Sequence, residues 1–216
     1  MSEATINKSS LEAIKKEFLL FKEKAHCSSY IACFGKTFVG EEEENYKISQ
    51  DIGELVINNS FGVLHGGYIG TMQAVSEGAN RGISQDKNKN AFWNIGVPMK
   101  TFDKDVKRAD CSQLTATENI LDRKRVLVEM CDACIVLPVG GMGTLLEVIE
   151  IFHVNQINSK FGGQIKPIIF YGKVWKELME SIENKLDLKG QSNGKDFTYY
   201  VDTLEQLKSI LKEIKI

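Results

Sequence analysis

Short apolar runs alternate with longer amphipathic stretches along this chain, and the alternation constrains its fold more than any other feature. Each apolar run is short enough for a buried strand, and each amphipathic stretch repeats apolar residues at helical spacing. This order of elements predicts a parallel sheet with helices on both faces. Right-handed crossovers then give an α/β fold with a Rossmann-like, doubly wound sheet.

The pattern also gives approximate bounds for each element. The expected strands are 29–35, 61–67, 92–97, 133–138, 166–172 and 197–202. The expected helices are 9–25, 41–59, 69–82, 117–131, 144–158, 174–186 and 203–214. The polar stretch 99–113 is expected to be irregular. The acidic run 41–44 is expected to be a solvated helix start, where the helix dipole favours negative charge.

Length and charge narrow the class of protein. A chain of 216 residues with 43% apolar content predicts one domain, 1–216, with the helix at 9–25 packing on it. A net charge of -2 gives no basic field for nucleic acid or an anionic membrane. The first residues lack a signal-peptide core, and no apolar run reaches the ~18–20 residues that cross a bilayer. A cytoplasmic protein is therefore expected.

The cysteines fit that compartment, because they are five in number and irregularly spaced. Cys131 and Cys134 form a C-x-x-C, which is compatible with a redox or zinc pair. No second pair or nearby histidine completes a zinc set, and Cys134 lies inside an apolar run. Burial as small apolar side chains is the favoured interpretation.

Ligands of such a sheet bind outside the carboxyl ends of the strands, which selects the loops 35–40, 65–71 and 138–144. In the last loop, glycines let the backbone approach a ligand closely. The N–H groups of the first helical turn then form an anion site, for which a phosphate is the natural occupant. The predicted phosphate-binding residues of this loop are Gly140, Gly141, Gly143 and Thr144.

Thr144 and Glu147 also form the pattern T-x-x-E, so they have a second interpretation. The pair could be a capping box that starts the helix and does nothing else. The three glycines favour a ligand site, because one glycine suffices for a turn.

The loop "HGGYIGT" is a second glycine-rich loop between a strand and a helix, with Gly66 and Gly67 as candidate binding residues. Its G-G-x-x-G is not the dinucleotide fingerprint G-x-G-x-x-G. Two glycine loops at neighbouring strand ends suggest a mononucleotide held between them.

The loop after the first strand contains "GKT", which looks like the end of a P-loop. The required first glycine would be residue 30, which is Tyr30, so the motif fails. Gly35, Lys36 and Thr37 remain candidate ligand contacts from the strand end.

Taken together, the motifs resemble those of the Lonely Guy (LOG) family, long labelled "possible lysine decarboxylases". "GGMGTLLE" at 140–147 resembles its P-G-G-x-G-T-x-x-E signature, and "DRK" supplies its Arg-Lys pair. Arg123 lies fifteen residues before Pro138, which is the family spacing. "HGGYIGTMQAV" and "YIACFGKTFVG" resemble two further family segments, so the likeness covers about 29–185.

The resemblance implies a catalytic pair, Arg123 and Glu147, with Lys124 contributing to binding. It implies hydrolysis of the N-glycosidic bond of a nucleoside 5'-monophosphate, with AMP or N6-modified AMP favoured. Family members include cytokinin-activating phosphoribohydrolases and bacterial nucleoside-monophosphate nucleosidases. A homodimer is implied as well. No metal or cofactor is expected. Lysine decarboxylation is not expected either, because the sequence has no distinctive lysine motif that would hold pyridoxal phosphate.

The sequence departs from the family pattern near the ligand. Val139 is inserted between Pro138 and Gly140, and a Gly-Lys-Thr replaces the usual Ser-Ser after the first strand. His65 replaces a usual glycine and could touch the ligand or bond to the backbone at the strand end. These changes keep an alternative function open, a non-catalytic nucleotide- or cofactor-binding protein like the molybdenum-cofactor carriers of the same fold.

Overall fold

The computed structural model describes residues 3–186, 197–214 and 216, and all its named strands belong to one sheet. The strands are β1 (Tyr30–Phe34), β2 (Gly62–His65), β3 (Asn94–Gly96), β4 (Ser112–Gln113), β5 (Ala133–Val136), β6 (Ile168–Tyr171) and β7 (Thr198–Val201). They lie in the order β4-β3-β2-β1-β5-β6-β7, and every neighbouring pair is parallel. The predicted parallel α/β fold is confirmed.

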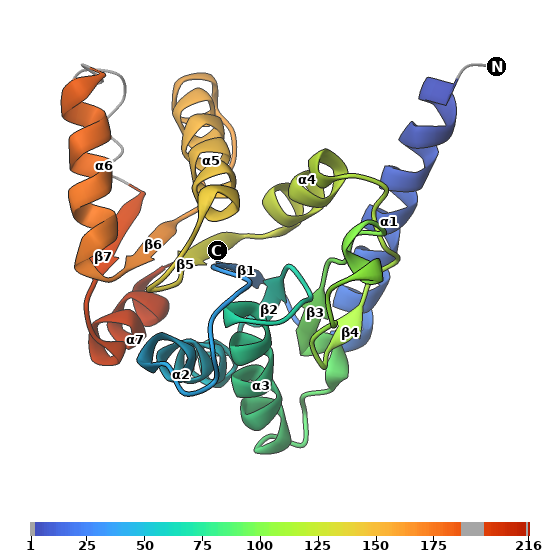
Figure 1. Ribbon diagram of the computed structural model, residues 1–216, viewed down its shortest axis with the longest axis horizontal. Coiled ribbons are helices and arrows are strands. Elements are labelled where there is room, and N and C mark those ends of the chain that lie inside the picture. The colour runs from blue at the N-terminus through green and yellow to red at the C-terminus, as the bar shows by residue number, and fades with distance from the viewer. Residues whose placement is uncertain (1–2, 187–196, 215) are drawn as a thin grey trace.

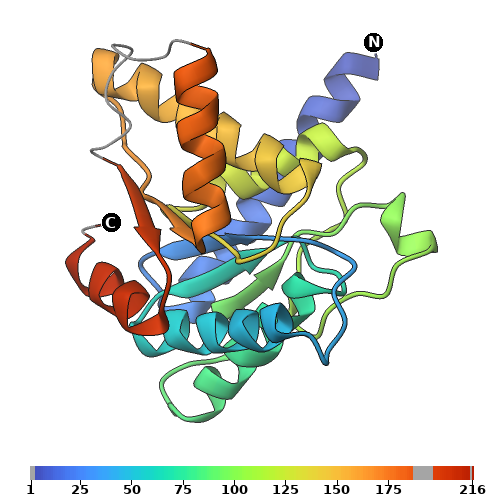
Figure 2. The ribbon, with the colours of Figure 1, turned by 60° about the vertical axis from the view of Figure 1, so that its left-hand side comes forward.

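Helices cover both faces of the sheet. They are α1 (Glu3–Ala25), α2 (Glu44–Asn58), α3 (Thr71–Ser84), α4 (Ile120–Met130), α5 (Met142–Phe161), α6 (Lys173–Lys185) and α7 (Leu204–Glu213). Figures 1 and 2 show α2, α3 and α7 on one face and α1, α4, α5 and α6 on the other. Two short 3-10 helices, η1 (Ala91–Trp93) and η2 (Phe102–Lys104), complete the connections. None of the described helices is both long and apolar enough to span a bilayer.

Burial on both faces explains why the central strands appear in the sequence as continuous apolar runs. Every residue of β1, β2, β5 and β6 is buried, as expected for a parallel sheet covered by helices. Cys131 and Cys134 are 2% and 0% exposed within this core. The prediction that they are buried small side chains is confirmed.

β4 was not predicted, because the stretch 99–113 was expected to be irregular throughout. β4 has only two residues, Ser112 and Gln113, which pair with Ile95 and Gly96 of β3. A polar edge strand of this length carries no apolar pattern, so its pairing is decided by tertiary context.

The acidic run before α2 is exposed, as predicted, but the helix begins only at Glu44. The preceding acids lie in a turn, where the Gly40 N–H donates to the Glu43 carboxylate at 2.7 Å. This bond closes the turn at Glu43, and the helix begins at the next residue, Glu44.

The strand order reverses direction at β1, whose neighbours are β2 and β5. β1 leads into α2 on one face, whereas β5 leads into α5 on the other (Figure 2). The two connections diverge at the carboxyl ends of these strands. Such a switch point leaves a crevice between neighbouring loops, and the candidate site lies there.

Candidate functional site

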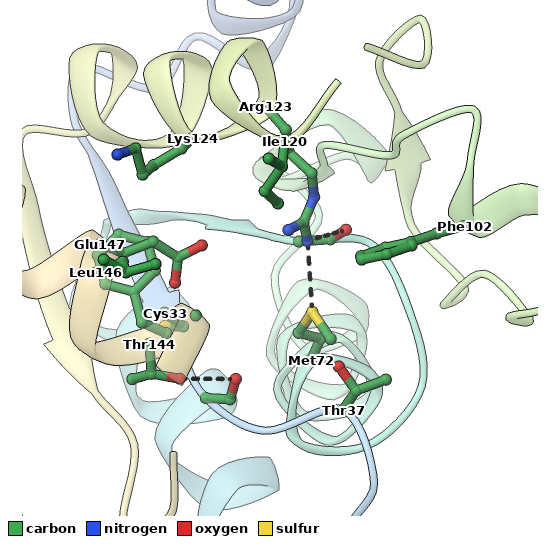
Figure 3. A pocket seen from close by; sticks show the side chains of 14 residues that line it. Cys33, Thr37, Met72, Phe102, Ile120, Arg123, Lys124, Thr144, Leu146 and Glu147 are labelled. Carbon is green, nitrogen blue, oxygen red and sulfur yellow. Dashed lines mark hydrogen bonds between the residues drawn. The ribbon is translucent and has the colours of Figure 1, made fainter. Parts of the chain in front are cut away.

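A cavity of ≈ 170 Å³ opens at the carboxyl ends of β1 and β2 and the start of α5. Figure 3 shows Arg123 entering it from α4, Glu147 from α5 on another side, and Phe102 opposite Glu147. Lys124 lies beside them on α4. Eight of the twelve sequence-predicted functional residues therefore line one cavity: Gly35, Thr37, Gly66, Arg123, Lys124, Gly143, Thr144 and Glu147.

Arg123 is buried, at 6% exposure, and is held from behind by backbone. Its Nε donates to the Val97 carbonyl at 2.9 Å, and one terminal nitrogen donates to the Gly66 carbonyl at 2.8 Å. The other terminal nitrogen donates to none of the residues that the structure describes and lies on the Glu147 side in Figure 3. The guanidinium is thus fixed with one edge free for a ligand.

Two aromatic rings also pack near the Arg123 guanidinium. Its guanidinium carbon lies 5.8 Å from the ring centres of both Tyr68 and Phe102. Burial lowers the pKa of Arg123, and the charge of Glu147 partly opposes that shift. An arginine remains charged despite such a shift, so the site holds a permanent, rigidly placed cation.

Glu147 is partly buried and has no hydrogen bond or ion pair with any residue that the structure describes. Burial raises its pKa from the ordinary 4.5 to about 7, and the charges of Arg123 and Lys124 oppose this rise. Glu150 adds to it. The carboxyl group therefore titrates near neutral pH, which is the behaviour expected of a group that exchanges protons during a reaction.

Thr144 is not the N-cap of α5, so the interpretation of T-x-x-E as a capping box is wrong. α5 begins at Met142, with Gly141 as its N-cap, which makes Thr144 the third helical residue. The Thr144 hydroxyl donates to the Gly35 carbonyl at 3.0 Å and accepts from the Gly141 N–H at 3.3 Å. The Thr144 side chain thus connects the loops after β1 and β5. Its hydroxyl is engaged in these contacts, so the backbone N–H of Thr144 is the group that a ligand can contact.

The glycines of this loop are divided between two cavities. Gly143 lines the cavity with Arg123, and a Cβ built on it would meet no atom within 4 Å. Gly140 and Gly141 instead line a neighbouring cavity of ≈ 590 Å³ with Trp175. A Cβ on Gly140 would lie 2.7 Å from the Trp175 ring, so close packing accounts for this glycine.

The other candidate loops contribute unequally. Gly66 passes so close to Arg123 that a Cβ would lie 1.8 Å from its terminal nitrogen, so only glycine fits there. Thr37 lines the cavity, whereas Lys36 is exposed outside its lining. Gly67, at φ 80°, also lies outside the lining and forms the turn after β2.

His65 bonds to the backbone at the strand end, which decides between its two interpretations. It is fully buried, its Nδ1 accepts from the Gly67 N–H at 3.1 Å, and its Nε2 lies 3.1 Å from Asn94 Oδ1. Burial lowers its pKa to about 4. A neutral histidine with both nitrogens engaged stabilises the turn and does not touch the cavity.

Six apolar residues of the cavity were not predicted from the sequence: Cys33, Phe34, Met72, Phe102, Ile120 and Leu146. Ile120 lies one turn before Arg123, and Leu146 lies one turn after Gly143, so helical spacing could have identified both. Phe102 lies in the irregular stretch. It is brought to the site because the Tyr68 hydroxyl bonds to the Met99 backbone N–H at 2.7 Å and to Asp103 at 3.0 Å.

Known structures share this fold at low sequence identity. The molybdenum cofactor binding protein from Rippkaea orientalis aligns with a TM-score of 0.59 and 19% identity, over 86% of this chain and 96% of that one. The molybdenum cofactor carrier protein from Chlamydomonas reinhardtii aligns with a TM-score of 0.56 and 15% identity, over 86% of this chain and 97% of that one. Identities this low establish likeness of fold alone.

Two curated proteins named cytokinin riboside 5'-monophosphate phosphoribohydrolase are similar in sequence. The one from Mycobacterium marinum is 32% identical over 88 residues, which is 40% of this chain and 42% of its own length. The one from Mycobacterium tuberculosis is 26% identical over 128 residues, which is 58% of this chain and 62% of its own length. The matches span less than two thirds of either relative.

The family is given by a longer match. Residues 72–214 match the protein family described as "Possible lysine decarboxylase". That stretch is more than half of the chain and contains Arg123, Lys124, the glycine loop and Glu147. It is the family that the motifs predicted, and the chain belongs to it.

Proposed function

We propose that this protein hydrolyses the N-glycosidic bond of a nucleoside 5'-monophosphate and releases the free base and ribose 5-phosphate. One observation carries the proposal. A fixed Arg123 and an unpaired Glu147 with a pKa of about 7 face one cavity, next to the open N-terminus of α5. The names of the two mycobacterial relatives support the same reaction class.

The reaction suits these residues. The C1'–N bond breaks, the water oxygen bonds to C1', and a water proton ends on the base nitrogen. Positive charge builds up on the ribose in the transition state, as in glycoside hydrolysis. The ionised form of Glu147 would stabilise that charge or orient the water. Its pKa of about 7 leaves a large ionised fraction at neutral pH.

The phosphate would lie at the start of α5. The first N–H groups of a helix have no acceptor within the helix, and the helix dipole attracts an anion. Open space at Gly143 leaves room for the phosphate oxygens. The free edge of Arg123 would bind phosphate or ribose oxygens. Phosphate and Glu147 would then lie at opposite ends of one ribose, which limits their repulsion.

The base would contact the apolar wall of the cavity. Met72 and Phe102 lie opposite Glu147 in Figure 3, and Ile120 lies above them. An aromatic side chain next to a planar base offers a stacking surface. The family resemblance favours AMP or an N6-modified AMP as the substrate, and the relatives are named for a cytokinin riboside 5'-monophosphate.

A homodimer belongs to this proposal. The cavity of ≈ 170 Å³ is smaller than the roughly 300 Å³ typical of ligand pockets, which favours a second chain that completes the enclosure of a nucleotide. Apolar side chains are exposed beside it, with Ile120 at 51%, Leu121 at 63% and Leu146 at 56%. An exposed apolar patch next to a site favours a protein interface.

Light scattering at micromolar concentration tests the dimer. The wild type should have twice the chain mass, and Leu121→Glu should shift it toward monomer. Leu19→Glu is the matched control, because Leu19 is a similarly exposed leucine, at 56%, on α1. A monomeric wild type would contradict the assembly.

Chromatography of reaction mixtures tests the activity. The purified protein is incubated with AMP, GMP, CMP, UMP and isopentenyl-AMP, and free base and ribose 5-phosphate are measured. Release of one base in equal amount with ribose 5-phosphate supports the proposal and names the substrate. Lack of release from all five contradicts it for these nucleotides.

The second candidate is a nucleotide- or cofactor-binding protein without turnover. The division of Gly140, Gly141 and Gly143 between two cavities favours it, because fewer glycines of the loop then serve the cavity with Glu147. An intact ligand that co-purifies from cells and survives incubation would support this candidate.

A further inference from the structure

Two cations on α4 lie opposite two acids on α5. Arg123 and Lys124 are consecutive, and Glu147 and Glu150 are three residues apart on one face of their helix. One ion pair joins them: Lys124 Nζ lies 2.5 Å from Glu150 Oε2. Glu147 takes part in no ion pair with the residues that the structure describes, although both cations influence its pKa.

The Lys124–Glu150 pair is partly shielded from water, since its side chains are 24% and 29% exposed. Lys124 also lines the cavity beside Glu147. The lysine therefore has two acids within its range on α5, and a flexible ammonium group can move between acceptors. Its observed contact with Glu150 leaves Glu147 facing the cavity alone.

We infer that Glu150 is a positioning residue, which holds Lys124 away from Glu147 and so keeps the Glu147 carboxylate free for the substrate. The importance of that freedom for catalysis rests on the proposed function. A lysine bound to Glu147 would neutralise its charge and occupy its oxygens. Both effects would weaken its interaction with a positively charged ribose.

The groups around Glu147 are few enough to make this testable. Arg123 and Lys124 face it from α4 and lower its pKa, whereas Glu150 on α5 raises it. Cys134 of β5 and Cys33 of β1 lie beneath, and burial raises the pKa of both thiols, so they remain neutral. Charge changes near Glu147 at neutral pH therefore come from the α4–α5 residues.

The test is a double-mutant cycle read by carbon-13 NMR of glutamate carboxyl groups. The Glu147 signal is assigned as the one lost in Glu147→Gln. Glu150→Gln should release Lys124 to Glu147 and lower the Glu147 pKa by about 1 unit or more. In a Lys124→Met background the same substitution removes only a like charge, so its effect should be at most half as large.

Two further variants guard against a purely structural effect. Glu150→Asp keeps the carboxylate and should restore most of the wild-type titration, and Glu150→Ala replaces Glu150→Gln if that variant fails to fold. Equal pKa shifts of Glu147 in the wild-type and Lys124→Met backgrounds would overturn the inference, because Glu150 would then act only as a neighbouring charge.

The readout separates this inference from the proposed function. If the enzyme turns over nucleotides, Glu150→Gln should also move the acidic limb of kcat/KM to lower pH and reduce kcat. If no nucleotide is hydrolysed, the proposed function fails, yet the NMR cycle still decides whether Glu150 controls Lys124.

Discussion

Arg123 and Glu147 face each other across the cavity without forming an ion pair (Figure 3). The reason lies behind Arg123, where the carbonyls of Val97 and Gly66 and two aromatic rings fix the guanidinium. It cannot move to Glu147 without losing buried hydrogen bonds. Opposite charges are thus held apart, and the space between them is available to a ligand that both groups contact.

Arg123→Lys should therefore disable the site although it conserves charge. A lysine has all its donors on one nitrogen, so it cannot reproduce bonds made from two separate nitrogens of the guanidinium or the planar contact with the rings. We expect kcat/KM to fall about 100-fold or more, because the cation is misplaced. Loss of the buried bonds should lower the free energy of unfolding by about 1–3 kcal/mol, measured by urea denaturation.

Arg125→Lys is the control for this substitution, because Arg125 is exposed on the same helix. It should match the wild type in both measurements. Wild-type kcat/KM in Arg123→Lys would show that the fork geometry is not needed.

Gly143→Ala separates folding from phosphate binding. The added Cβ meets nothing within 4 Å, and alanine is the better residue inside a helix. The free energy of unfolding should stay the same or rise by about 0.5–1 kcal/mol. The methyl group would nevertheless crowd a phosphate at the helix start, so calorimetry should show at least tenfold weaker binding of AMP and inorganic phosphate. Unchanged affinity would place the phosphate elsewhere.

His65 should make the protein sensitive to acid. The unfolded chain takes up a proton near the ordinary pKa of 6.5, whereas the buried ring resists it until about pH 4. The His65 contribution to stability is therefore constant above pH 6.5 and falls by up to about 3 kcal/mol as the pH drops toward 4. Glu147 contributes in the opposite direction, because burial raises its pKa to about 7 and the folded chain gains stability when that carboxyl is protonated. Urea denaturation of Glu147→Gln between pH 4 and 7 measures the His65 slope, because this background removes the opposing titration.

In the Glu147→Gln background, His65→Asn should flatten the acid slope, although it lowers stability at pH 7 by weakening the contact with Asn94. His153→Asn is the matched control, because His153 is exposed. If Glu147→Gln loses stability below pH 6.5 in parallel with and without His65→Asn, another group controls the acid response.

The sequence identified the parts of the site that depend on local chemistry. Arg123 and Glu147 are placed by helical spacing and by the glycine-rich turn between β5 and α5. Both features depend on residues that are close together in the sequence, so they can be recognised from the sequence alone. The parallel strands were equally visible, because strands buried on both faces must be continuously apolar.

Other parts depend on contacts distant in sequence, which a local pattern does not carry. Lys36 is outside the cavity because its carbonyl accepts both the N–H and the hydroxyl of Thr71, at 3.0 and 3.1 Å. Phe102 enters because Tyr68 holds its segment. The start of α5 at Met142 follows the bonds of Thr144 to Gly35 and Gly141.

The most direct test of the central claim is base release by wild type and Glu147→Gln, measured alongside nucleotide affinity. The substitution removes the charge of Glu147 and keeps its size. We predict loss of release by at least about 1,000-fold with a Kd for the nucleotide within about threefold of wild type. Near-wild-type release from Glu147→Gln would contradict the assignment of Glu147 as the catalytic carboxylate.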